Sequence, residues 1–502
     1  MELPFSSRLT VRFMANPLIL LHGYSDTSKG FQKWRDALIE NKQLDPSKVH
    51  LINYVSLANE ITIRDIAEAF DRALVHEAGI KENDPFDVIV HSTGMLVIRA
   101  WLTRYASIDG KLNVQKIDQT RINRLQRLIA LAPASNGSPV AHKGRSWIGA
   151  LVKGNRAIGR DFLESGHQVL SALELASPFT WDLGSKDMFG PGHNKRFKVG
   201  PESPFVFTIC GDTGLGKIAS VVTQKLGTKI HGSDGVVRWA GAALNSRLLT
   251  IDYTGERSGE ANNAGTSNAE IHVSDWSNQN NKLILWPGLN HGSIMDPENK
   301  KCKQLFELVA KALDVKDDNQ FNNWNAEAAQ LASENRDQEP DKWQQFVIRV
   351  CDERGDGVTD WTVEVHVKRK NKEVEELDID DIHAFSNEKS FRCLHVNLSK
   401  CELSDRCDIE NIESFEMKLT MNTDSDYIHY VATRGGSYKS SEMISNGLSE
   451  LIVDLKDFLN PQANKFHLLM PYTTTFIEFR VNRDPLLEED KGRILHVFKQ
   501  EN

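Results

Sequence analysis

Short segments that are apolar at nearly every position recur along the first 315 residues, and they restrict the fold more than any other feature. We expect six of them to be strands: Pro17–Leu21, Leu51–Tyr54, Asp87–Val90, Leu128–Leu131, Phe205–Cys210 and Leu283–Trp286. Strands that are apolar on both faces are typical of a parallel sheet covered by helices on each side. Apolar residues spaced three and four apart predict helices over Arg64–Ala78, Met95–Tyr105 and Lys301–Leu313. This alternation predicts an α/β fold.

The pattern changes after residue 315. Residues 316–342 are polar and poor in strand formers, and we expect a linker there, with a helix over Trp324–Glu334. From residue 343 to 502 apolar and polar residues alternate in short runs such as WTVEVHVKRK and FEMKLTMN, separated by breaks rich in Asp, Gly and Asn. Runs of this kind predict an antiparallel β-sandwich.

Composition excludes several classes of protein. A chain of 502 residues with 60 Lys and Arg against 69 Asp and Glu has a net charge of −9. A mildly acidic chain has no general attraction for phosphate backbones, so we expect no nucleic-acid partner. The six cysteines contain no CxxC pair, which argues against a zinc ribbon or a thioredoxin-like site. The chain shows neither a signal peptide nor an apolar run long enough to span a bilayer, which predicts a cytoplasmic or peripheral membrane protein.

One turn carries the most specific chemical signal. The expected strand Asp87–Val90 is followed by His91, Ser92, Thr93 and Gly94 and then directly by a helix. A serine at the apex of a strand–turn–helix is the geometry of a nucleophile elbow. The usual motif is G-x-S-x-G, and this chain has Val90 in the place of the first glycine. By itself such a serine could equally be a helix N-cap.

Three other segments complete the signal. His22 and Gly23 follow the first strand, where a hydrolase with this architecture places its second oxyanion donor; the donors would be the backbone N–H groups of Tyr24 and Thr93. His291 lies in the loop after the last strand of the first domain. The acid should lie between the serine and the histidine in sequence. We favour Asp234 in HGSDGVV over the alternative, Asp212 in CGD.

Together these segments resemble the lipases and esterases of the α/β-hydrolase superfamily. The elbow with its following helix, DVIVHSTGMLVIRAWL, and the segment LAPASNGSP are similar to those of bacterial lipases and phospholipases. With an early HG loop and a C-terminal β-sandwich, the chain most resembles the PlaB-type bacterial phospholipases A. The resemblance implies Ser92, Asp234 and His291 as the catalytic triad. The change of pattern predicts domains at 1–315 and 343–502. The insertion at about 137–204, which contains Trp147–Val152, should form a helical cap over the substrate, with an immobile packed helical layer as the alternative.

The sequence therefore predicts a serine carboxylic-ester hydrolase that cleaves acyl esters of lipids, with a lipid or ester as substrate and no cofactor or metal. A triacylglycerol lipase, a small-ester esterase or an acyltransferase would use the same triad. An inactive hydrolase fold that serves as a binding scaffold is the non-enzymatic alternative. We further expect the β-sandwich to provide peripheral membrane contact or homo-oligomer formation.

Overall fold

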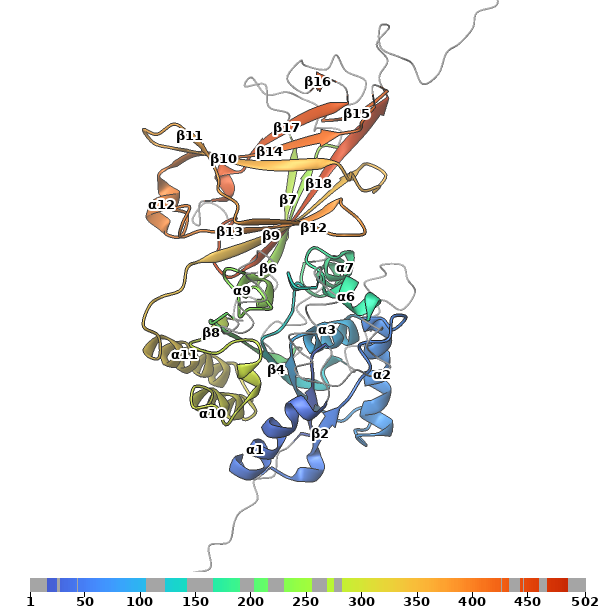
Figure 1. Cartoon of the computed structure of the whole chain (residues 1–502), viewed down its shortest axis with the longest axis vertical. Helices are drawn as coiled ribbons and strands as arrows, with labels where there is room; N and C mark the ends of the chain where they lie inside the picture. The colour runs from blue at the N-terminus through green and yellow to red at the C-terminus, as the bar shows by residue number, and fades with distance from the viewer. Residues whose placement is uncertain are drawn as a thin grey trace, which may run out of the picture. The chain divides into compact units, whose positions relative to one another are not determined.

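The computed structural model describes residues 16–24, 28–42, 44–104, 122–141, 166–189, 203–214, 230–254, 269–274, 282–425, 427–432, 443–445, 447–459 and 467–485 (Figure 1). The chain divides into two compact units. The first consists of residues 1–245 and 276–340, and the second of residues 246–275 and 341–502.

The first unit is built on a six-stranded sheet in which all neighbouring strands are parallel. In spatial order the strands are β2 (Val49–Ile52), β1 (Leu18–Leu21), β3 (Phe86–His91), β4 (Leu125–Leu131), β5 (Phe205–Gly211) and β8 (Leu283–Trp286). All six strands expected from the sequence are present, with β2 beginning two residues and β4 three residues before the predicted segments. The parallel α/β sheet is confirmed.

Helices pack against both faces of this sheet. Alternate residues of the central strands contact α1 (Gln32–Lys42), α10 (Lys303–Ala312) and α11 (Asp318–Glu334) in one apolar cluster. On the opposite face, the Phe86 ring lies edge-on to Trp101 of α3 (Gly94–Arg104) and tilted toward Phe70 of α2 (Ile63–His76). Short helical turns complete the unit: η1 (Ser28–Phe31), η2 (Pro46–Lys48), α9 (Trp239–Ala242) and η4 (Ser293–Met295).

The predicted cap region contains two described helices, α6 (His167–Leu173) and α7 (Pro178–Asp187). A fully buried ion pair links α7 to α3: the Arg99 guanidinium donates to both carboxylate oxygens of Asp187, each at 2.8 Å. The same guanidinium also donates to the carbonyl oxygen of Ser135 in the loop after β4. Helix α7 is therefore bound firmly to the layer beneath it. Residues 142–165 and 190–202 of the predicted cap, which include Trp147–Val152, lie outside the described residues.

The second unit is a two-sheet sandwich. One sheet has the order β11 (Val374–Glu376), β10 (Trp361–Arg369), β14 (Ile412–Asn422), β17 (Leu448–Asp454) and β16 (Met443–Ser445). The other has the order β12 (Asp381–Ala384), β13 (Phe391–Asn397), β9 (Trp343–Asp352), β18 (Thr474–Pro485), β6 (Ser246–Asp252) and β7 (Glu270–Val273), and β15 (Ile428–Val431) pairs with β18. The short helix α12 (Arg406–Glu410) and the turn η5 (Lys456–Phe458) connect strands of this unit.

Inward-facing residues of both sheets form one apolar core, which confirms the predicted β-sandwich. The sandwich is not antiparallel throughout. Strand β18 runs parallel to both of its neighbours, β9 and β6, while the other strand pairs of the unit are antiparallel.

The two units do not divide the chain at the predicted boundaries. Residues 246–275, expected within the hydrolase domain, supply β6 and β7 to the sandwich, because β6 pairs with β18 over seven residues. The predicted linker instead contains α11, which begins at Asp318 with Asp317 as its N-cap and buries Phe321 and Trp324 in the core of the first unit. Its polar residues other than Asn325 lie on the exposed face, which explains why the segment looks like a linker in sequence.

Among the residues that the structure describes, no helix has the length and apolar character needed to cross a bilayer.

The buried pair between Arg99 and Asp187 makes a stability prediction. We expect Asp187→Ala to lower the free energy of unfolding by about 3–5 kcal/mol, because it leaves the Arg99 charge buried without its partner. The matched control is Asp182→Ala on the same helix, whose carboxylate pairs at the surface with Arg64 and Lys186 and should contribute about 0–1 kcal/mol. Urea unfolding followed by circular dichroism measures both. Equal losses for the two variants would contradict the prediction.

Candidate active site

The turn after β3 has the backbone geometry of a nucleophile elbow. Ser92 lies at its apex with φ of 54°, a left-handed conformation that residues other than glycine seldom adopt. The turn is held in place by its backbone: Ser92 N–H donates to Leu131 O at 3.2 Å, and Ala134 N–H donates to Ser92 O at 3.1 Å. Helix α3 begins two residues later, at Gly94. The strain at Ser92 is thus stabilised by the neighbouring strand β4 and the loop that follows it.

Two glycines allow the end of β1 to approach this turn closely. A Cβ atom on Gly94 would lie 2.9 Å from Leu21 O and 3.0 Å from His22 O, and one on Gly23 would lie 2.9 Å from the Cβ of Ser92. Any larger residue at either position would force the backbone apart. Val90, where the motif usually has its first glycine, is fully buried within the sheet and pairs with Leu21 on one side. Its bulk is accommodated as an ordinary core residue.

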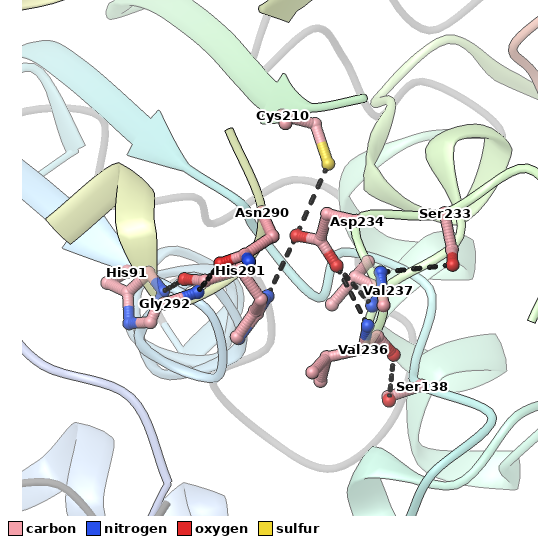
Figure 2. Close-up of polar contacts among 12 residues, drawn as sticks. His91, Ser138, Cys210, Ser233, Asp234, Val236, Val237, Asn290, His291 and Gly292 are labelled. Atoms are coloured by element: carbon pink, nitrogen blue, oxygen red, sulfur yellow. Dashed lines mark hydrogen bonds and ion pairs between the residues drawn. The ribbon is translucent and has the colours of Figure 1, made fainter. Parts of the chain in front are cut away.

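Asp234 and His291 form a buried hydrogen-bonded pair (Figure 2). His291 Nδ1 lies 2.8 Å from Asp234 Oδ2, and His291 N–H donates to the Asp234 carbonyl oxygen at 3.1 Å. The other carboxylate oxygen, Oδ1, accepts from the backbone N–H groups of Val236 at 3.0 Å and Val237 at 2.8 Å. The carboxylate is therefore fixed by its own loop and directed at the imidazole.

Asp212, the alternative acid, lies at the end of β5 and makes different contacts. Its Oδ1 accepts from Gly288 N–H at 2.8 Å, and its Oδ2 is 3.6 Å from Arg336 Nε. Of the two candidate acids, the structure brings only Asp234 into contact with His291. Asp212 instead joins the loop after β8 to the residues that follow α11.

The electrostatics suit an ionised acid at Asp234. Complete burial by itself raises the pKa of the Asp234 carboxyl group. The nearby His291 and the hydrogen bonds from His291, Val237 and Val236 together lower this pKa by more, so the net pKa lies below its ordinary value of 3.8. The Cys210 thiol also donates to Asp234 Oδ2, at 3.5 Å between sulfur and oxygen. Burial first, and then the Asp234 charge, raise the pKa of Cys210 well above its usual range, so this thiol remains a neutral donor. In the sequence, Cys210 reads only as the last residue of a buried strand, with no sign that it belongs to the site.

His91 is a second residue that the sequence analysis missed. Its Nε2 lies 3.0 Å from His291 O, and the two imidazole rings are 4.7 Å apart between centroids. Since a carbonyl oxygen can only accept, Nε2 carries the proton and donates. Burial first, and then the neighbouring His291, lower the pKa of His91 to about 3. His91 directly precedes Ser92, so this bond ties the loop of His291 to the elbow.

The described contacts include no hydrogen bond between the side chains of Ser92 and His291; the loop of His291 is joined to the elbow through His91, the residue before Ser92. Ser92 and His291 are 7% and 8% exposed, so both are almost entirely covered by protein. Catalytic hydrogen bonds of this kind are often long or poorly aligned until substrate binds.

The two predicted oxyanion donors belong to segments that adjoin the serine in the chain or in the fold. Thr93 follows Ser92 at the start of α3, where backbone N–H groups have no acceptor within the helix. Tyr24 follows Gly23, whose Cα lies against Ser92. Burial raises the pKa of the Tyr24 hydroxyl to about 12, so its side chain remains neutral. For metals, the described ranges contain no cluster of three or more His, Cys, Asp or Glu side chains that could hold an ion.

His91 makes the stability of the protein depend on pH. In the unfolded chain its imidazole takes up a proton near pH 6.5, whereas in the folded state it does so only near pH 3. Between these values the unfolded state binds more protons, so stability falls as the pH falls. We expect wild type to lose about 2 kcal/mol more than His91→Gln between pH 7 and pH 5.

Urea unfolding at the two pH values measures this difference. His76→Gln, a change at an exposed position of α2, is the control and should follow the wild-type pH dependence. A His91→Gln variant that loses as much stability as wild type on acidification would show that His91 is protonated in the folded state.

Comparison with known proteins gives a clear result for structure and none for sequence. No family model matches the chain, and no curated protein matches it. Two structures of the phospholipase PlaB from Legionella pneumophila, one in complex with thio-NAD, superpose with a TM-score of 0.70 at 20% identity, covering 94% of this chain and 94% of that chain. A lipase from Bacillus licheniformis, BlEst2, matches at a TM-score of 0.35 and 14% identity, over 59% of this chain and 92% of its own, which is too weak to support an argument.

The resemblance inferred from the sequence is thus confirmed at the level of the fold. Nearly the whole chain, including the sandwich as well as the hydrolase sheet, has the architecture of the PlaB structures. The protein is an α/β-hydrolase-fold chain with a β-sandwich unit, similar in structure to the bacterial phospholipase PlaB.

Proposed function

We propose that the protein is a serine carboxylic-ester hydrolase that acts on acyl esters of lipids. The observation that carries the proposal is the buried Asp234–His291 pair, tied through His91 to a strained serine elbow. A serine needs a base to remove its proton, and the base needs a third group to orient it. This arrangement supplies all three in the order expected for an α/β-hydrolase.

The proposed reaction has two halves. His291 Nε2 takes the proton from Ser92 Oγ as the oxygen attacks the acyl carbonyl carbon, and the resulting oxyanion accepts hydrogen bonds from the N–H groups of Tyr24 and Thr93. The tetrahedral intermediate collapses, the alcohol leaves with the proton from His291, and an acyl-Ser92 ester remains. Water then attacks this ester with His291 again as base, which releases the fatty acid and restores Ser92. Asp234 keeps the proton on His291 Nδ1 throughout.

A lipid substrate is supported by the structural likeness to the phospholipase PlaB, and for this reason we place phospholipase A or lysophospholipase activity first. A triacylglycerol lipase, a small-ester esterase and an acyltransferase share the same chemistry. A binding scaffold would not need the Asp234 carboxylate directed at His291. For the sandwich unit we propose peripheral contact with a lipid surface or self-association.

The substrate proposal predicts a specific activity pattern. Purified protein should release fatty acid from phospholipid or lysophospholipid vesicles, and Ser92→Ala should reduce that release by at least about 10⁴-fold because the nucleophile is lost. A panel with triglyceride and short p-nitrophenyl esters, assayed for both proteins, identifies the substrate class. Hydrolysis restricted to short esters would indicate a plain esterase. No Ser92-dependent release from any substrate would reject the enzyme in favour of the scaffold.

The choice of acid is tested by a matched pair of variants. Asp234→Asn should lower kcat by about 10²–10⁴-fold, because an amide cannot hold the correct tautomer of His291 or stabilise its charged form. Asp212→Asn should stay within about 3-fold of wild type, since an amide oxygen can still accept from Gly288 N–H. Steady-state kinetics on the best substrate of the panel decides between them. The reverse order would assign the acid to Asp212.

A further inference from the structure

The loop that carries Tyr24 is attached to an aromatic pair outside the proposed triad. The imidazole of His22 stacks on the ring of Tyr54, with centroids 4.2 Å apart and planes 4° from parallel. Tyr54 N–H donates to His22 Nε2 at 3.2 Å, and the Tyr54 hydroxyl donates to His22 O at 2.9 Å. The other ring nitrogen, His22 Nδ1, lies 2.7 Å from Gly23 O. His22 is fully buried, whereas Tyr54 is half-buried and follows strand β2.

These contacts determine the tautomer of His22. A backbone N–H can only donate, so Nε2, which receives the bond from Tyr54, must be unprotonated. The ring proton is therefore on Nδ1 and is donated to the carbonyl oxygen of Gly23, which can only accept. Tyr54 therefore contacts the His22 ring twice, through the stack and through its own N–H, and its hydroxyl holds the backbone carbonyl of His22.

The bond to Gly23 O orients the proposed oxyanion donor. The peptide between Gly23 and Tyr24 is planar and trans, so its C=O and N–H groups point in opposite directions. When His22 holds the carbonyl oxygen on one side, the Tyr24 N–H must point to the other. Gly23 lies against the elbow, since a Cβ there would be 2.9 Å from Ser92 Cβ and 3.3 Å from His91 Nδ1.

We propose that His22 and Tyr54 are positioning residues that fix the direction of the Tyr24 N–H for stabilising the oxyanion. This inference rests on the proposed function and extends it to two residues that do not touch the substrate. An oxyanion donor is effective because it is already aligned before charge develops, so a loop free to rotate would lose part of that advantage. The stack and the three hydrogen bonds supply the alignment.

Tyr54 is well suited to a test because it is not part of the packed core. It lines a cavity of about 550 Å³ between β2 and α2, together with His50, Ile66 and Phe70. Tyr54→Phe removes only the hydroxyl bond to His22 O, and Tyr54→Leu also removes the stack. His22→Asn keeps a donor near the position of Nδ1, while His22→Gln keeps a polar group only near the position of Nε2. His50→Asn, in the wall of the same cavity, is the matched control.

The readout separates alignment of the oxyanion donor from general damage. For each variant we would measure kcat/KM, the affinity for a trifluoromethyl ketone that forms a tetrahedral oxyanion on Ser92, and the affinity for an uncharged ether analogue of the substrate. The value of kcat/KM and the ketone affinity should fall together, by about 10- to 10³-fold for His22→Gln and by less than about 10-fold for Tyr54→Phe. Ether affinity should stay within about 2-fold. His22→Asn should recover part of the loss, and His50→Asn should match wild type.

Two results would overturn the proposal. The first is that the Tyr54 and His22 variants fold and keep kcat/KM and ketone affinity within about 2-fold of wild type. If the His22 variants do not fold, Tyr54→Phe and Tyr54→Leu decide this point alone. The other is a parallel loss of ether and ketone affinity, which would assign the pair to the shape of the binding cleft. Ser92→Ala is assayed alongside. Wild type with no more activity than Ser92→Ala would instead refute the ester-hydrolase function itself.

Discussion

The close approach between the end of β1 and the turn after β3 is the constraint on which the rest of the site depends. Gly94 allows the carbonyls of Leu21 and His22 to lie against the first turn of α3, and Gly23 allows the next peptide to lie against Ser92. Because the two strands are neighbours in a parallel sheet, their carboxyl ends meet at one edge. The serine and both proposed oxyanion donors therefore come from residues that lie within four positions after the end of β1 or β3. The left-handed backbone of Ser92 is held by a hydrogen bond to β4.

The acid and base are attached to this centre through polar contacts. The Asp234 carboxylate accepts hydrogen bonds from two N–H groups of its own loop. It also accepts hydrogen bonds from His291 Nδ1 and from the thiol of Cys210. His91, neutral because it is buried, joins the carbonyl of His291 to the elbow. The site is therefore connected by hydrogen bonds among groups with a fixed direction of donation. An arrangement of this kind does not need to reorganise when charge develops during a reaction.

Local sequence patterns predicted the helices and strands of the first unit well. They predicted the boundary between the two units less well. The six strands, the elbow and the helix after it follow from apolar runs and turn chemistry that operate over a few residues. Most polar residues of α11 lie on its exposed face, so its sequence is typical of a linker although Phe321 and Trp324 are buried in the core. Strand β6 looks like any other buried strand. Its membership of the second sheet depends on pairing with β18, more than two hundred residues later, which no local pattern reports.

By itself the sequence determined the parallel sheet and the presence of a sandwich, because apolar periodicity is a local pattern. From the chain order of a hydrolase site it also proposed a serine, a histidine and two candidate acids, Asp234 and Asp212. Only the tertiary structure decided which acid contacts His291, how firmly α7 is bound to α3, and that His22, His91, Cys210 and Tyr54 belong to the same constellation. The physical reason is that these relations are contacts between side chains on different strands and loops. Their distances and directions exist only once the sheet has brought those strand ends together.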